Sequence, residues 1–165
     1  VIVVLAAIVP LFPTVRDWTT RQVDDARDRV QQAVEDITGA DTETASYVRN
    51  ADAPCLTRDE MIYYLESFLG PRGGPNWTDP LAVPNLATDL TALPPAYITV
   101  AAHDPLRDDG AIFRDRLAAA QVPVGFREEP LLAHSYMRAR HHSEPAMKGF
   151  RAIAAALQQL AATAV

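Results

Sequence analysis

Short apolar runs alternate along the chain with longer segments in which apolar residues recur every three or four positions. A short, continuously apolar run is typical of a strand buried on both faces, whereas the three-to-four spacing is typical of a helix with one buried face. The runs predict buried strands at 6–12, 97–102 and 122–128. The periodic segments predict helices at 20–37, 57–69, 108–120 and 145–160.

The order of these elements predicts an α/β fold. A strand, a helix and a second strand follow one another between residues 97 and 128, and this order is typical of parallel strands. We therefore expect three parallel strands with flanking helices. Residues 14–94 interrupt the sheet as a helical excursion, which we expect to form a lid or cap over the strand ends. Residues 95–165 carry the strand–helix–strand–helix part.

Local signals mark the starts of three helices. Thr57 and Glu60 form a capping box, in which each side chain bonds to the backbone amide of the other residue. Asp108 is expected to cap the helix that follows the 97–102 strand. Pro145 opens the last helix, because proline is well tolerated at the first helical position.

Composition narrows the class of protein. The 165 residues suit a single domain, and 48% hydrophobic with 22% charged residues is ordinary for a soluble globular protein. A net charge of −6 without a basic stripe argues against nucleic acid and anionic membranes as partners. The apolar start is interrupted by Pro10 and is shorter than the roughly 20 residues a membrane span needs. Because the chain opens on Val1, we expect sequence upstream. The lone Cys55 excludes an internal disulfide and fits a reducing compartment, so we expect a cytoplasmic protein.

Two residues thirty positions apart carry the strongest hint of chemistry. Asp104 follows the 97–102 strand, and His134 follows the 122–128 strand and a short apolar loop. Parallel strands would place both at the carboxyl edge of the sheet, where α/β proteins bind ligands. An acid followed by a histidine is also the second half of a Ser…Asp…His catalytic order. The alternatives are an aspartate that serves a turn or helix cap and a structural histidine.

The segment Leu93-Pro-Pro-Ala-Tyr-Ile-Thr-Val-Ala-Ala-His-Asp-Pro-Leu-Arg-Asp-Asp-Gly110 resembles the acid segment of hormone-sensitive-lipase-type esterases, which have the α/β-hydrolase fold. The segments 113–124 and 76–81 are similar to that family as well. The resemblance implies that Asp104 is the triad acid, that His134 is the general base, and that short-chain acyl esters are the substrates. It implies no metal or organic cofactor, and it suggests a homodimer for the full-length enzyme.

The chain departs from that family at the nucleophile. It contains neither the Gly-x-Ser-x-Gly turn nor a His-Gly-Gly-Gly-type oxyanion loop, and both normally precede the strand at 6–12. We therefore expect the C-terminal half of such an enzyme, inactive by itself. Ser135 stands where the family usually has glycine, and the segment 13–57 is longer than usual. The serines of the chain are Ser46, Ser67, Ser135 and Ser143.

Other hypotheses stay open. The chain could act by binding alone, as a pseudoenzyme or as a subunit completed by another polypeptide. A flavodoxin-like binding domain is a further alternative, but it would need a phosphate-binding loop that the glycines of this chain do not supply. Cys55 lacks a positioned base, and His141, His142 and Glu144 lack the fuller ligand set of a metal site. Glu128 and Glu129 face opposite sides of a strand, so they do not form a paired site. An acyl pocket under the lid could be lined by Trp18, Tyr63, Tyr64 and Trp77.

Overall fold

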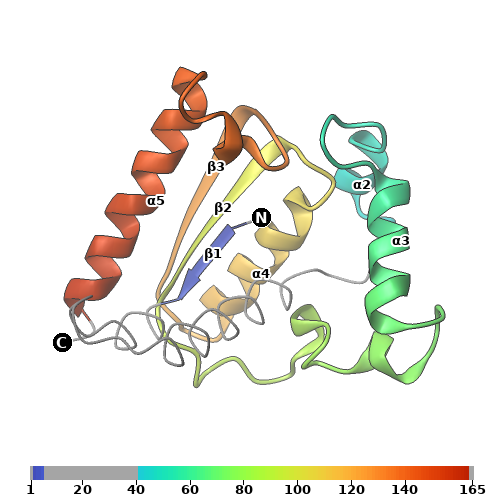
Figure 1. Cartoon of the computed structure of the whole chain (residues 1–165). Coiled ribbons are helices and arrows are strands. Elements are labelled where there is room, and N and C mark those ends of the chain that lie inside the picture. The colour runs from blue at the N-terminus through green and yellow to red at the C-terminus, as the bar shows by residue number, and fades with distance from the viewer. Residues whose placement is uncertain (1, 6–40, 164–165) are drawn as a thin grey trace, which may run out of the picture.

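The computed structural model describes residues 2–5 and 41–163. The strand predicted at 6–12 and the helix predicted at 20–37 lie outside the described residues, and so does Trp18. The described part is a small sheet with helices on both sides (Figure 1).

The sheet contains β1 (Ile2–Leu5), β2 (Ala96–His103) and β3 (Val124–Ala133), in that spatial order. β2 and β3 are parallel, as predicted, but β1 runs antiparallel to β2, with Ile2 opposite Thr99. β1 lies before the strand predicted at 6–12, which is outside the described residues, so the expected parallel direction of that strand stays a prediction. An apolar run indicates a buried strand without indicating its direction.

Both faces of β2 are covered, which explains its continuous apolar sequence. Ile98 and Val100 pack on one face against Phe113 and Leu117 of α4 (Arg107–Ala119). On the other face, a cluster of Ala101, Leu132 and Ala146 joins the sheet to α5 (Glu144–Thr163). Figure 1 shows the two helices on opposite sides of the strands. In this part of the chain the elements thus follow in the order β2, α4, β3, η5 and α5.

The carboxyl ends of β2 and β3 coincide. The segment 130–133, expected to be a loop, continues β3, and after an irregularity beyond Ala101 the last pair is His103 with Ala133. β3 is an edge of the described sheet, where a proline such as Pro130 is tolerated because its missing N–H is not needed. Asp104 directly follows β2 and His134 directly follows β3, so both residues lie at the same edge of the sheet.

The described part of the excursion, residues 41–94, forms its own apolar cluster. It includes α2 (Ala45–Arg49), α3 (Arg58–Leu69) and the short 3₁₀ helices η3 (Pro75–Thr78) and η4 (Pro84–Leu86). The capping box at the start of α3 is present as predicted. In Figure 1, α2 lies beside the end of β2 where the chain turns into α4. No helix in residues 41–163 is long and apolar enough to cross a membrane. The cluster consists of Tyr47, Leu56, Met61, Leu65, Leu69, Trp77, Val83 and Leu106.

Candidate active site

Asp104 and His134 are in direct contact at the carboxyl edge of the sheet. The Nδ1 atom of His134 lies 3.0 Å from Oδ2 of Asp104. Asp104 is 2% exposed, whereas the side chain of His134 is 28% exposed. A carboxylate can only accept, so Nδ1 carries the hydrogen and Nε2 is the free basic atom of the neutral imidazole. This pairing orients a histidine for proton transfer while leaving part of its ring accessible.

The turn after β2 holds the Asp104 carboxylate in place. Its second oxygen, Oδ1, accepts a hydrogen bond of 3.0 Å from the backbone N–H of Leu106. Burial alone would raise the pKa of Asp104, but favourable interactions, the largest of them the hydrogen bond with His134, hold that pKa below its usual value. Asp104 is therefore ionised at neutral pH.

The start of α4 differs from the prediction. The residue before the helix is Leu106, whose side chain makes no cap, so the expected capping role of Asp108 is wrong. Asp108 lies in the first turn, where its Oδ2 accepts a hydrogen bond of 2.8 Å from the backbone N–H of Ser46. The helix can begin without a side-chain cap because Asp104 already satisfies one amide before it.

His134 is followed by a left-handed residue. Ser135 has φ of 58°, and it precedes the 3₁₀ helix η5 (Tyr136–Ala139). A side chain in this region costs roughly 1–2 kcal/mol relative to glycine. Ser135, which replaces the glycine usual in the resembled family, therefore adopts a conformation that glycine takes without steric cost.

A second buried carboxyl lies near the pair. Asp109 is 1% exposed, and its Oδ2 accepts a hydrogen bond of 3.2 Å from the hydroxyl of Tyr47. Within the described residues, its Oδ1 has no hydrogen-bond partner. Burial and the neighbouring carboxylates of Asp104 and Asp108 raise the pKa of Asp109 well above its usual value, against the opposing effect of Tyr47. A neutral Asp109 leaves Asp104 as the charged acid beside His134.

The raised pKa of Asp109 predicts a pH-dependent effect of Asp109→Asn. The folded state holds a proton that the unfolded state releases above about pH 4, so wild-type stability falls as the pH rises through this range. Asparagine has no such proton. We expect the free energy of unfolding of the variant, relative to wild type, to increase by about 1 kcal/mol or more between pH 4 and pH 8. Urea titrations at both pH values measure this difference, and a constant difference would contradict it.

The predicted pocket residues differ in how exposed they are to solvent. Trp77 is buried in the excursion cluster, where its indole N–H donates to the Gly70 carbonyl oxygen at 3.0 Å. Tyr63 and Tyr64 are 67% and 53% exposed on α3, and their rings meet edge to face. Trp18 lies outside the described residues. The acyl-pocket role of these four residues stays a prediction.

The weaker candidates remain separate from the acid–histidine pair. Cys55 is exposed and free. His141 and His142 are exposed, and no group of three potential metal ligands occurs among the described residues. Glu129 is buried beside Arg127, whereas Glu128 pairs with Arg107, so the two carboxylates are separated as expected.

None of the four serines lies on a turn from a strand into an α-helix. Ser46 is buried on α2, and Ser67 lies on α3, where its hydroxyl donates to the Tyr63 carbonyl oxygen. Ser135 directly follows His134, and Ser143 precedes α5. Ser135, next to His134 in the described chain, lies between β3 and the 3₁₀ helix η5 rather than on a strand-to-α-helix turn.

Sequence reasoning missed two residues that contact the acid turn. Ser46 and Asn50, on and just after α2, hydrogen-bond to the segment 102–108. They lie in a polar stretch without periodicity, so only a comparison with proteins of the same fold could have singled them out.

Comparisons with known proteins agree with this geometry. A family model described as alpha/beta hydrolase fold matches residues 19–138. Carboxylesterase NlhH of Mycobacterium tuberculosis is 40% identical over 104 residues, which cover 61% of this chain and 32% of that protein. Esterase LipI of the same organism is 41% identical over 97 residues, covering 59% and 30%. A solved structure described as a bacterial heroin esterase superposes with a TM-score of 0.63 at 31% identity, covering 75% of this chain and 39% of that one. The chain thus spans about a third of the length of the curated relatives it matches.

Proposed function

Because the chain belongs to the α/β-hydrolase fold family, in its hormone-sensitive-lipase-type branch, we propose that it supplies the acid and the general base of a serine carboxylesterase. The observation that carries this proposal is the 3.0 Å contact between His134 Nδ1 and the buried Asp104 carboxylate. The similarity to carboxylesterase NlhH and esterase LipI supports ester hydrolysis as the reaction.

In this reaction, Nε2 of His134 takes the proton of a serine hydroxyl as its oxygen attacks the ester carbonyl. The tetrahedral intermediate collapses, the bond to the alcohol oxygen breaks, and the imidazolium returns the proton to the departing alcohol. His134 then removes a proton from water, which attacks the acyl-enzyme. The bond to the serine oxygen breaks, the imidazolium returns the proton to that oxygen, and the carboxylic acid is released. Asp104 stabilises the imidazolium in both halves of the cycle. Short-chain acyl esters are the substrates that the family resemblance favours.

We also propose that the nucleophilic serine lies outside these 165 residues, either in sequence that precedes them or on a second polypeptide. The absence of a Gly-x-Ser-x-Gly motif and the positions of the four serines support this proposal. We call this chain, together with the sequence that supplies the serine, the assembled enzyme.

A chain that acts by binding alone is the second candidate, and the missing nucleophile is the observation that favours it. The two candidates differ in the DNA upstream of the Val1 codon. An in-frame Gly-x-Ser-x-Gly motif supports the esterase, whereas a start codon beside Val1 favours the silent chain.

Turnover of p-nitrophenyl acetate tests the proposed function. We expect the assembled enzyme to hydrolyse this ester, and the 165-residue chain to give the same rate as its own His134→Ala variant. Clear turnover by the chain alone that disappears in His134→Ala would show that the nucleophile lies within these residues. An inactive assembled enzyme would overturn the esterase proposal.

A further inference from the structure

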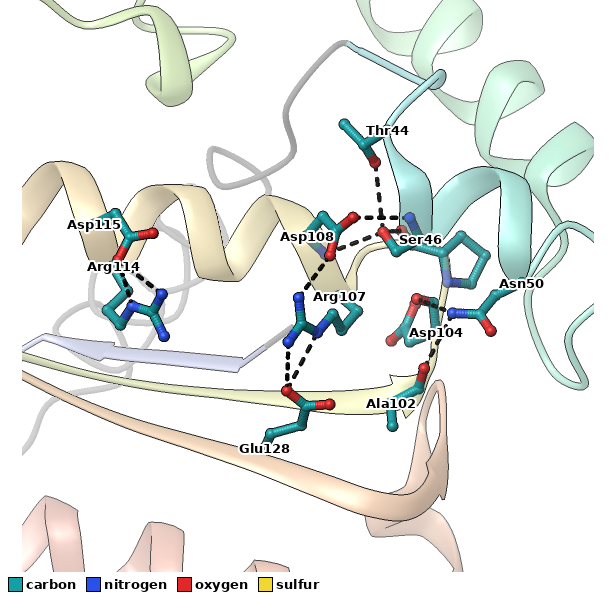
Figure 2. Close-up of polar contacts among 11 residues, drawn as sticks. Thr44, Ser46, Asn50, Ala102, Asp104, Arg107, Asp108, Arg114, Asp115 and Glu128 are labelled. Carbon is teal, nitrogen blue, oxygen red and sulfur yellow. Dashed lines mark hydrogen bonds and ion pairs between the residues drawn. The ribbon is translucent and has the colours of Figure 1, made fainter.

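The backbone around Asp104 is bonded to the end of α2. β2 ends at His103, which pairs with Ala133, so Asp104 lies just beyond the last pair of the ladder. The side-chain amide of Asn50 donates to the carbonyl oxygens of Ala102 at 3.1 Å and of Asp104 at 3.0 Å. Figure 2 shows this amide bridging the two carbonyl groups. Asn50 is 8% exposed, so water competes little for these bonds.

Ser46 holds the other half of the same turn. Its hydroxyl donates to the Pro105 carbonyl oxygen at 2.5 Å and accepts from the backbone N–H of Asp108 at 3.0 Å. The Ser46 amide also donates to the Asp108 carboxylate (Figure 2). Ser46 and Asn50 are four positions apart, so they lie on the same face of α2, and together they span the turn from Ala102 to Asp108.

Apolar contacts dock the same turn against the excursion. Leu106, two residues after Asp104, is 6% exposed in the cluster that contains Tyr47, Met61 and Leu65. The hydroxyl of Tyr47 reaches Asp109 in the first turn of α4. The turn that carries the acid is thus attached to α2 by both polar and apolar contacts.

We propose that Asn50 and Ser46 are positioning residues for the catalytic acid, and that α2 fixes the Asp104 backbone so that its carboxylate meets His134. This inference rests on the proposed function for its catalytic meaning, although the geometry stands without it. A reacting group must be held within about 0.5 Å of its productive position, and a turn beyond the end of a strand needs outside bonds to achieve that. The excursion therefore orients the acid directly, in addition to any role as a lid.

NMR of the 165-residue chain tests this inference without requiring activity. In Asn50→Ala, we expect the pKa of the Asp104 carboxyl to rise toward the usual aspartate value, because its contact with His134 loosens. The downfield signal of the proton on His134 Nδ1 should weaken in parallel. In the assembled enzyme, the same variant should lower kcat roughly 10–100-fold while KM changes by less than about threefold.

Asn76→Ala is the matched control, because the Asn76 amide also donates to a backbone carbonyl oxygen, that of Leu69, at 3.2 Å. It should leave the Asp104 titration and the His134 signal unchanged. Ser46→Ala repeats the test if Asn50→Ala does not fold. Unchanged NMR signals in both Asn50→Ala and Ser46→Ala would overturn the positioning role, whatever the esterase assay gives. Altered signals in a chain whose assembled wild-type enzyme is inactive would support the positioning of Asp104 and overturn only the proposed function.

Discussion

Replacing His134 by alanine in the assembled enzyme is expected to lower kcat for p-nitrophenyl acetate roughly 10⁴–10⁶-fold. The loss is large because the variant has no base to take the serine proton and no acid to return it to the departing alcohol. The 3.0 Å contact with a buried carboxylate makes His134 the histidine to which this role is assigned. Alanine at position 134 should change KM little, since the imidazole acts mainly in the transition state.

His142→Ala is the matched control for this experiment. His142 is also in the segment after β3, but it is exposed and close to the start of α5. Its removal should change kcat by less than about threefold, the range expected of a surface substitution. Retention of a tenth or more of the activity in His134→Ala would exclude His134 as the general base.

The second large effect is expected for Asp104→Asn, which should lower kcat roughly 10⁴-fold. The asparagine amide can donate toward Nδ1 of His134, which favours the tautomer with its hydrogen on Nε2, and that tautomer cannot accept the serine proton. The shape of the side chain is preserved, so the loss reports on the tautomer rather than on packing. Kinetics of the assembled enzyme measure this loss of kcat. Asp115→Asn is the control, because Asp115 is an exposed carboxylate of α4 that pairs with its neighbour Arg114.

Asp104→Asn should also change acid stability. The folded state lowers the pKa of Asp104, so its carboxylate adds stability that is present above about pH 4 and is lost as the pH falls through the lowered value. The variant should therefore lose less stability than wild type on acidification.

In the kinetic experiment, an activity of Asp104→Asn within tenfold of wild type would contradict the assignment of Asp104 as the triad acid.

The sequence was sufficient to predict the part of the fold that brings the pair together. β2, α4 and β3 have strong local patterns, and a parallel strand–helix–strand unit leaves few topologies. The contact between Asp104 and His134 follows from that topology, since each residue comes directly after its strand. The family resemblance favours a catalytic pair over an ordinary turn aspartate, a role that stays a prediction, and the family match at residues 19–138 confirms the α/β-hydrolase fold.

The remaining features depend on contacts that local patterns do not encode. The direction of β1 cannot be predicted from a short apolar run. The segment 130–133, predicted to be a loop, continues β3, because an edge strand tolerates a proline. The bonds from Ser46 and Asn50 to the acid turn join residues 62 and 54 positions apart, in a polar segment without periodicity. The sequence pattern made Asp108 the cap of α4. In the structure, the backbone N–H of Leu106, the residue before the helix, donates to the carboxylate of Asp104 instead.

Labelling with a fluorophosphonate tests the central claim most directly, because this reagent forms a covalent bond only with a serine activated by a nearby base. The claim is that the chain carries the acid and base of an esterase without its nucleophile. We predict that peptide mass spectrometry of the labelled assembled enzyme will place the phosphonate on a serine outside these 165 residues, and that the isolated chain will stay unlabelled. His134-dependent labelling of Ser46, Ser67, Ser135 or Ser143 would contradict the claim.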